Sequence, residues 1–124
     1  TTLGGRKCHF DLWEPVGYLS EEKRTPLPKE EALDQYGDNL KRSFTYKALN
    51  RLIQGSAADM TKLAMRDLWR EGLVPHLQVH DELDYSVETE EQAQLIIDKM
   101  VNCVELKVPL VVDYEKGQTW GEAE

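Results

Sequence analysis

The residues around position 80 alternate between apolar and polar side chains on both sides of a short acidic stretch. Apolar residues recur at every second position, at Leu77, Val79, Leu83, Tyr85 and Val87. Period-two alternation on both sides of a turn predicts a β-hairpin. Two-residue hairpin turns normally contain glycine, because their central residues need a positive φ. We expect this turn to hold the carboxylates of Asp81 and Glu82, with His80 beside them and no glycine.

A turn that replaces glycine with adjacent negative charges is a candidate functional site. Carboxylate oxygens are the ligands that Mg²⁺ prefers, so Asp81 and Glu82 are candidate metal ligands. An alternative stays open at this point, because acidic residues are common in turns and Asp tolerates left-handed backbone. On that alternative, residues 78–82 form a plain acidic turn.

The stretch that follows has the pattern of an amphipathic helix. Residues 89–92, Thr-Glu-Glu-Gln, match a helix capping box. The apolar positions after it are Ala93, Ile96, Ile97, Met100, Val101 and Val104. Their helical spacing predicts one apolar stripe, which we expect to face the core.

A longer helical pattern begins near Asp38. Its apolar positions are Leu49, Ile53, Ala57, Met60, Ala64 and Leu68, which predict one buried stripe. Gly72 suits the residue just after the helix, and Pro75 lies beyond it. Gly55 falls inside the pattern, where it either divides the pattern into two helices or permits a close approach of a ligand or backbone.

A second set of residues in this region lies at helical spacing. Tyr46, Asn50 and Gln54 are four residues apart and would share one face of a continuous helix. Carboxamides both donate and accept hydrogen bonds, so they can contact the acceptor-rich edges of bases in the DNA minor groove. The alternative is that Asn50 and Gln54 are two solvated amides on an exposed face.

The remaining segments complete an α+β prediction. We expect short strands over residues 1–10 and 108–115, and a long surface connection over 11–38 with a helical turn near 29–35. Together with the hairpin, the strands would form an antiparallel sheet with the helices packed on one face. The chain has 124 residues, enough for one domain with its own core, so we expect a single domain.

The charge is unevenly distributed along the chain. The net charge is −8, but residues 40–80 carry seven bases and three acids, whereas residues 81–124 carry twelve acids and three bases. An autonomous nucleic-acid binder would usually be basic overall, so only the middle segment could face a phosphate backbone. The alternative is that its bases, including Lys62, Arg66 and Arg70, merely solvate a helix. The two cysteines have no metal-ligand spacing, which favours a cytoplasmic thiol protein and leaves a disulfide open.

Three stretches, taken in order, resemble the C-terminal end of family A DNA polymerases, the DNA polymerase I type, and in particular its phage-like members. They are the Asn-x-x-x-Gln-Gly motif with its continuation at 50–59, the segment 78–83, and residues 108–110 with Trp120. Residues 2–7 are also similar to the Thr-x-x-Gly-Arg-Arg segment with which this family re-enters its palm after the fingers. The resemblance covers most of the chain except residues 11–38, and it implies a single palm subdomain over 1–124.

The resemblance implies a role for five residues. Asp81 matches the aspartate of the third polymerase motif, which binds the catalytic Mg²⁺ pair, and Glu82 matches the acid beside it. His80 matches the histidine that contacts the 3′ end of the primer. Asn50 and Gln54 match the amides that follow the minor groove near the primer terminus.

The same resemblance implies an incomplete site. Tyr46 stands where the family frequently has arginine, which puts one minor-groove or phosphate contact in question. Two-metal phosphoryl transfer needs acids on both sides of the metal pair. The family's other metal aspartate, and its fingers helix for the incoming dNTP, lie upstream of the segment matched here. We therefore expect the chain to be part of a DNA-directed DNA polymerase and to be inactive alone. Its expected partners are primer-template DNA and the upstream polymerase segment, and no membrane is expected. Its expected location is the cytoplasm of a bacterium or of a phage-infected host.

Two other functions compete with this one. A small metal-dependent nuclease or phosphatase could use the same carboxylate turn, although two adjacent acids rarely complete a two-metal site. A non-catalytic α+β interaction module would use residues 81 and 82 as a plain acidic turn. A nuclease assay discriminates the first, and the gene sequence upstream of Thr1 discriminates the second.

Overall fold

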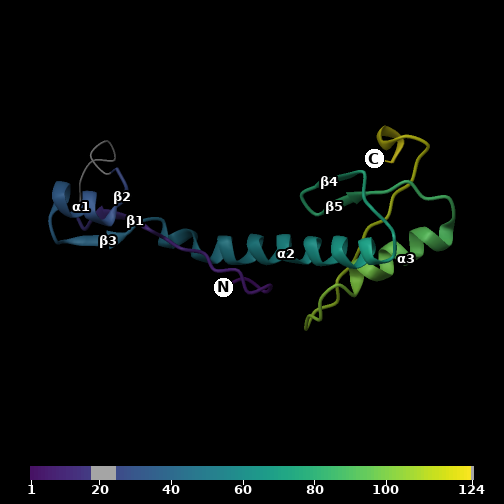
Figure 1. Cartoon of the computed structure of the whole chain (residues 1–124), viewed down its shortest axis with the longest axis horizontal. Coiled ribbons are helices and arrows are strands. Elements are labelled where there is room, and N and C mark those ends of the chain that lie inside the picture. Colours follow the sequence, from purple (N-terminus) through teal and green to yellow (C-terminus); the bar gives the residue numbers. More distant parts are fainter. Residues whose placement is uncertain (18–24, 124) are drawn as a thin grey trace. The chain divides into compact units, whose positions relative to one another are not determined.

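The computed structural model describes residues 1–17 and 25–123, and the chain divides into two compact units (Figure 1). The first unit is Thr1–Gln54 and the second is Gly55–Glu124. The described residues form small antiparallel sheets and three α-helices. The predicted α+β class is therefore confirmed. The predicted single sheet is wrong, because the described strands form two separate sheets and the hairpin β4–β5 pairs only with itself.

The first unit contains a three-stranded antiparallel sheet. Its strands are β1 (Leu12–Pro15), β2 (Leu27–Pro28) and β3 (Leu40–Arg42), in the order β2-β1-β3. Trp13 of β1 stands opposite Arg42 of β3. The Trp13 ring also lies 4.9 Å from the Arg42 guanidinium carbon, so the cross-strand pair is a cation–π contact.

Helix α1 (Lys29–Tyr36) packs against β1 in this unit. It begins directly after Pro28, whose fixed φ suits the start of a helix. It ends at Gly37, which has φ 76° and would be strained with a side chain. Ala32 is fully buried on its inner face. This helix confirms the helical turn that the sequence predicts near residues 29–35.

A buried polar cluster joins β1 to β3 and the residue after it. Ser43 is 1% exposed, and its hydroxyl donates a hydrogen bond of 2.8 Å to Glu14 Oε2. Lys41 Nζ lies 3.2 Å from Glu14 Oε1. Because both carboxylate oxygens have partners, Glu14 can be part-buried in β1 at little cost.

The long helix α2 (Ala48–Arg70) follows a 3₁₀ turn, η2 (Thr45–Lys47). It continues through Gly55, so the pattern forms one helix rather than two, and the boundary between the units falls within it. Gly72 follows its end with φ 80°, which confirms the predicted role of this glycine.

The predicted buried stripe of α2 is only partly correct. Leu68 and Ala64 are 0% and 2% exposed, as expected. Leu49 and Ile53, in the first turns of α2, are 67% and 59% exposed. The spacing of apolar residues identifies the apolar face of a helix. In the described part of the chain, that face of α2 is buried only near the C-terminal end of the helix.

The second unit contains the rest of α2, a two-stranded antiparallel sheet and the helix α3. The strands are β4 (Leu77–Val79) and β5 (Glu82–Asp84), and α3 is Glu90–Val101. A short 3₁₀ turn, η3 (Trp120–Glu122), lies near the end of the chain. Figure 1 shows β4 and β5 side by side.

Helix α3 begins as its capping box predicts. The Thr89 hydroxyl accepts a hydrogen bond of 3.2 Å from the Gln92 backbone N–H. The Gln92 side chain accepts one of 2.8 Å from the N–H of Glu88, one residue earlier than the usual reciprocal contact. Ala93 and Ile96 are buried, as the apolar stripe predicts.

Two strand predictions are wrong. Residues 1–10 and 108–115 form no strand in the structure. Gly5, with φ 83°, instead closes a tight bend in which the Thr2 N–H donates to the Arg6 carbonyl at 2.8 Å. A segment becomes a strand only where a neighbouring strand accepts its backbone hydrogen bonds, and these two segments have no such neighbour among the described residues.

The expected connection over 11–38 carries more structure than one helical turn. Its described part holds β1, β2 and α1, whereas residues 18–24 lie outside the described residues. That 11–38 is a surface insertion, and that 1–124 is one palm subdomain, stay predictions. Among the helices of the described ranges, none combines the length and the apolar character needed to cross a membrane.

Candidate functional site

The turn between β4 and β5 holds His80 and Asp81. Val79 pairs with Glu82 and Leu77 pairs with Asp84, so two residues remain between the strands. Glu82 is therefore the first residue of β5, and the expectation that both acids occupy turn positions is wrong because of this register. His80 has φ 51°, the left-handed conformation that a hairpin turn usually assigns to glycine.

The strained backbone of His80 is held by its neighbour. The Gln78 side-chain amide donates a hydrogen bond of 2.5 Å to the His80 carbonyl. Histidine is one of the few residues enriched in left-handed backbone, but the conformation still carries a cost. Such strained residues occur often at functional sites, which makes this turn a candidate on geometric grounds as well.

Asp81 in the turn and Glu82 at the start of β5 can offer oxygen ligands to a cation. Asp81 and Glu82 are both exposed. Mg²⁺ in proteins is commonly held by one or two carboxylates together with water and substrate phosphates, so this donor set fits part of such a site. Within the described ranges, no three His, Cys, Asp or Glu side chains are grouped closely enough to hold a metal ion. Asp81 and Glu82 can therefore supply at most two ligands, and the rest of a coordination shell would have to come from other groups.

Two polar groups at the end of β5 were not predicted from the sequence. Asp84 Oδ2 and the Tyr85 hydroxyl are buried and have no hydrogen-bond partner among the described residues. Burial raises the pKa of the Tyr85 phenol. Asp84 and Tyr85 fit the alternating pattern of an ordinary strand, so the sequence gives no sign that their polar atoms are buried.

The predicted amide pair lies on α2, in the first unit. Asn50 and Gln54 are one helical turn apart and both are exposed. Tyr46 precedes α2 in the turn η2, so the α-helical spacing covers the two amides only. The Tyr46 side chain is 79% exposed.

The structure thus places the predicted site residues in two sets. Asn50 and Gln54 belong to the first unit, whereas His80, Asp81 and Glu82 belong to the second. Each set is internally compact, since the first occupies one turn of a helix and the second the tight turn after β4 together with the first residue of β5. Both sets present their side chains to solvent.

Two cations beside the amide pair were also missed. Lys47 Nζ lies 5.1 Å from the centroid of the Phe44 ring and 5.6 Å from that of Tyr46. The guanidinium carbon of Arg51 lies 5.0 Å from the centroid of the Phe10 ring. The sequence does carry a signal for them, because no acidic residue occurs between Asp38 and Asp59.

Comparison with known proteins gives one consistent family. The family model for "DNA polymerase family A" matches residues 1–122. A "DNA-directed DNA polymerase" of Pseudomonas phage M6 is 38% identical over 123 residues, which is 99% of this chain and 15% of that protein. A "DNA polymerase I" of Synechocystis is 39% identical over 132 residues, 99% of this chain and 13% of that protein.

A third relative agrees with these two. A "DNA polymerase I" of Bacillus caldotenax is 46% identical over 92 residues, 66% of this chain and 10% of that protein. The chain therefore spans 10–15% of the length of these relatives. No solved structure matches the structure of this chain significantly. Since the family model covers nearly all of the sequence, the chain belongs to DNA polymerase family A.

Proposed function

We propose that this chain is the C-terminal palm part of a DNA-directed DNA polymerase, and that it acts as a nucleotidyltransferase only with the remaining parts of that enzyme. The single observation that carries the proposal is the match of residues 1–122 to the polymerase family. The exposed carboxylate turn and the exposed amide pair support it, because both have the chemistry that primer extension needs from this region.

Asp81 is the principal metal ligand in this proposal, with Glu82 as a second or weaker one. Their carboxylates would hold Mg²⁺ at the β4–β5 turn, where both side chains are exposed. Bound Mg²⁺ would supply electrostatic stabilisation to the charge that develops on the transferring phosphoryl group. The left-handed backbone of His80 fixes how the turn presents these groups.

The DNA contacts fall to the amides and to histidine. Asn50 and Gln54 each offer a donor and an acceptor, so they can hydrogen-bond to minor-groove acceptors without strong sequence preference. His80, next to Asp81, would contact the 3′ end of the primer. These contacts position the primer terminus, which contributes to catalysis by orientation rather than by proton transfer.

The proposal also implies that the chain is inactive alone. Two-metal catalysis needs acids on both sides of the metal pair, and a triphosphate needs cations to hold it. Both would come from the upstream palm and fingers, which also supply the contacts to the incoming dNTP. The place of action would be the bacterial cytoplasm or that of a phage-infected cell.

The test combines this chain with the upstream polymerase segment and measures primer extension. The mixture should extend a primer with Mg²⁺ and dNTPs, whereas this chain alone should not. Asp81→Asn should abolish extension, because the amide has no negative charge for the metal. Asp98→Asn, on the exposed surface of α3, is the matched control and should extend normally. If the mixture with Asp81→Asn extends the primer at the normal rate, the assignment of Asp81 as a metal ligand of a polymerase is wrong.

The competing nuclease or phosphatase gains no support from the structure. Such an enzyme would need a complete metal site within this chain, and the described residues bring no third ligand to Asp81 and Glu82. Incubation of the chain with DNA and Mg²⁺ or Mn²⁺ should therefore produce no cleavage. Cleavage that Asp81→Asn abolishes would favour the nuclease instead.

A further inference from the structure

The start of α2 carries positive charge without nearby acids in the sequence. Between Asp38 and Asp59 the chain has four cations and no carboxylate. Two of these cations are already engaged within the first unit. Lys41 pairs with Glu14 at 3.2 Å, and Arg42 Nη1 donates to the Phe10 carbonyl at 2.7 Å and lies 3.9 Å from Asp11.

The other two cations, Lys47 and Arg51, have a different environment. Both are exposed, and within the described ranges neither has a carboxylate partner. Lys47 lies over the rings of Phe44 and Tyr46. Arg51 lies over the ring of Phe10, and its Nη1 approaches the Cys8 sulfur at 3.4 Å. An aromatic ring holds a cation in place but leaves its full charge uncompensated.

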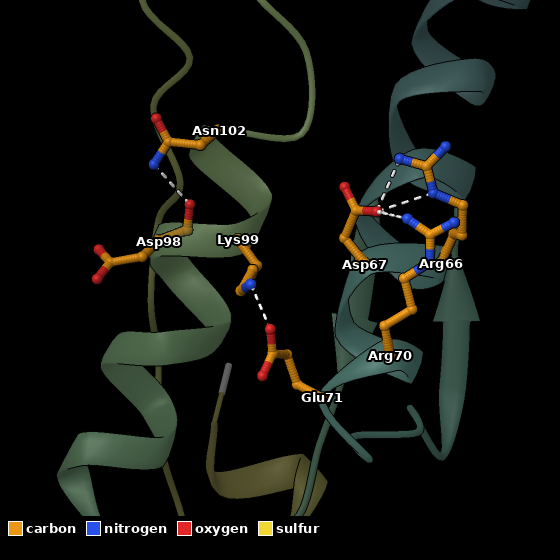
Figure 2. Close-up of polar contacts among 7 residues, drawn as sticks. All are labelled: Arg66, Asp67, Arg70, Glu71, Asp98, Lys99 and Asn102. Atoms are coloured by element: carbon orange, nitrogen blue, oxygen red, sulfur yellow. Dashed lines mark hydrogen bonds and ion pairs between the residues drawn. The ribbon is translucent and has the colours of Figure 1, made fainter.

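Three cations of the second unit, Arg66, Arg70 and Lys99, have carboxylate partners instead (Figure 2). Asp67 Oδ1 accepts hydrogen bonds from Arg66 Nε at 2.8 Å and lies 2.7 Å from Arg66 Nη2 and 3.5 Å from Arg70 Nη1. Lys99 Nζ pairs with Glu71 at 2.5 Å. Carboxylates of the same unit partly neutralise these three cations, so their charge is less available to a polyanion.

Lys47 and Arg51 are also correctly placed beside the amide pair. They are four residues apart, and the residue that links η2 to α2, Ala48, has right-handed helical backbone. Arg51 directly follows Asn50 in α2, so it lies on the helix face next to that of Asn50 and Gln54, and Lys47 is the last residue of η2, directly before the helix. Side chains that can contact base edges are thus flanked by charges that can contact the backbone of the same strand.

We propose that Lys47 and Arg51 bind two phosphates of the primer-template DNA whose minor groove faces Asn50 and Gln54. This inference rests on the proposed function. A guanidinium stacked on a ring still presents its N–H edge, which suits two phosphate oxygens at once. Phe10, Phe44 and Tyr46 act as positioning residues that order the cations before DNA binds. Lys47 and Arg51 would supply phosphate contacts in a region where Tyr46 stands in place of the arginine that is frequent in the family.

The test measures binding of the whole chain to a fluorescein-labelled primer-template duplex by anisotropy, without Mg²⁺ or dNTP, over a series of salt concentrations. Each phosphate contact to duplex DNA contributes about 0.9 to the slope of log K against log salt. The double variant Lys47→Gln/Arg51→Gln should therefore lower the magnitude of the slope by about 1.8. Arg70→Gln removes one charge from an exposed, paired arginine and should leave the slope unchanged.

A second variant separates loss of contact from loss of folding. Lys47→Arg/Arg51→Lys keeps both charges and should retain the slope of the unchanged chain, with its circular dichroism spectrum preserved. Polyglutamate, offered as a competitor at the same charge concentration, should displace the duplex poorly if the surface is shaped for phosphates.

Several results would overturn the inference. An unchanged slope in the Gln double variant, or an equal loss of slope in Arg70→Gln, would do so. No binding by the unchanged chain at low salt would also do so. Full displacement of the duplex by polyglutamate would indicate an acidic peptide as the partner instead. The assay contains no catalytic step, so its result is independent of the extension test. If Asp81→Asn mixtures extend primers normally, the proposed function fails while the slope measurement still stands.

Discussion

The guanidinium carbon of Arg51 on α2 lies 5.0 Å from the ring centroid of Phe10, a residue in the N-terminal segment before β1. This contact joins the N-terminal segment to the helix that carries the amide pair, within one compact unit. It orders an exposed cation that would otherwise sample many rotamers. Binding of a phosphate then requires less loss of side-chain entropy.

Removal of the Phe10 ring face should weaken DNA binding without changing its salt dependence. Phe10→Leu keeps an apolar side chain but removes the cation–π contact, which at an exposed site is worth about 0.5–1 kcal/mol. The Kd for the primer-template duplex should rise about two- to five-fold. The slope of log K against log salt should not change, because Arg51 keeps its charge.

The control for this prediction is Phe10→Tyr, which keeps the ring and should bind as the unchanged chain does. Anisotropy titrations at one low salt concentration and one higher concentration are sufficient. A Phe10→Leu chain that binds DNA as tightly as the unchanged chain would show that the ring does not order Arg51 for binding.

The backbone of His80 leads to a prediction about stability. Its φ of 51° is unfavourable for most residues and most unfavourable for β-branched ones. His80→Val should lower the free energy of unfolding by about 1–2 kcal/mol. His80→Asn tolerates this conformation and should leave the free energy nearly unchanged.

Urea unfolding followed by circular dichroism measures both variants of His80. Equal stability of the Val and Asn variants would mean that the turn relaxes to another conformation at no cost. His80→Gly provides an upper reference, because glycine adopts this φ without strain.

The buried hydroxyl of Tyr85 leads to a prediction about both stability and pH. The hydroxyl has no hydrogen-bond partner among the described residues, and a buried unsatisfied polar group costs about 1–3 kcal/mol. Tyr85→Phe removes this group, so it should raise the free energy of unfolding by about 1 kcal/mol at pH 7. A fall in stability at pH 7 would show that the hydroxyl does find a partner in solution.

The pH dependence of the same variant follows from the pKa shift. Burial raises the pKa of the Tyr85 phenol, so the folded chain binds this proton more tightly than the unfolded chain. The resulting stabilisation is fully present below the unfolded pKa of about 10 and is lost as the pH rises through the folded pKa. Between pH 9 and 11, the unchanged chain should therefore lose more stability than Tyr85→Phe, as urea unfolding at each pH would measure.

The local signals in the sequence were sufficient for some elements of this fold. The capping box at Thr89 defined the start of α3, and Gly72 marked the end of α2, because both act through backbone groups within one or two turns. The pairing of β4 with β5 also depends on residues a few positions apart. Such features need no information about distant parts of the chain.

Features that depend on a distant partner were not predictable in the same way. The alternation over residues 108–115 is typical of a strand, but the segment forms none without a neighbouring strand. Leu49 and Ile53 carry the apolar period of α2, yet burial needs a covering element that the sequence pattern does not specify. The ring contacts of Lys47 and Arg51 were missed because they arise from side-chain packing, while only the absence of acids was visible.

The exposed apolar side chains at the start of α2 have a consequence for how this chain behaves in solution. Exposed apolar side chains favour association between copies of the chain, and here they are those of Tyr46, Leu49 and Ile53. At pH 7 the net charge of −8 keeps copies apart by mutual repulsion. That repulsion vanishes near the isoelectric point of about 4.9, and concentrated salt screens it at any pH. The colloidal stability of the chain is thus electrostatic, and purification should avoid acidic buffers and salt precipitation.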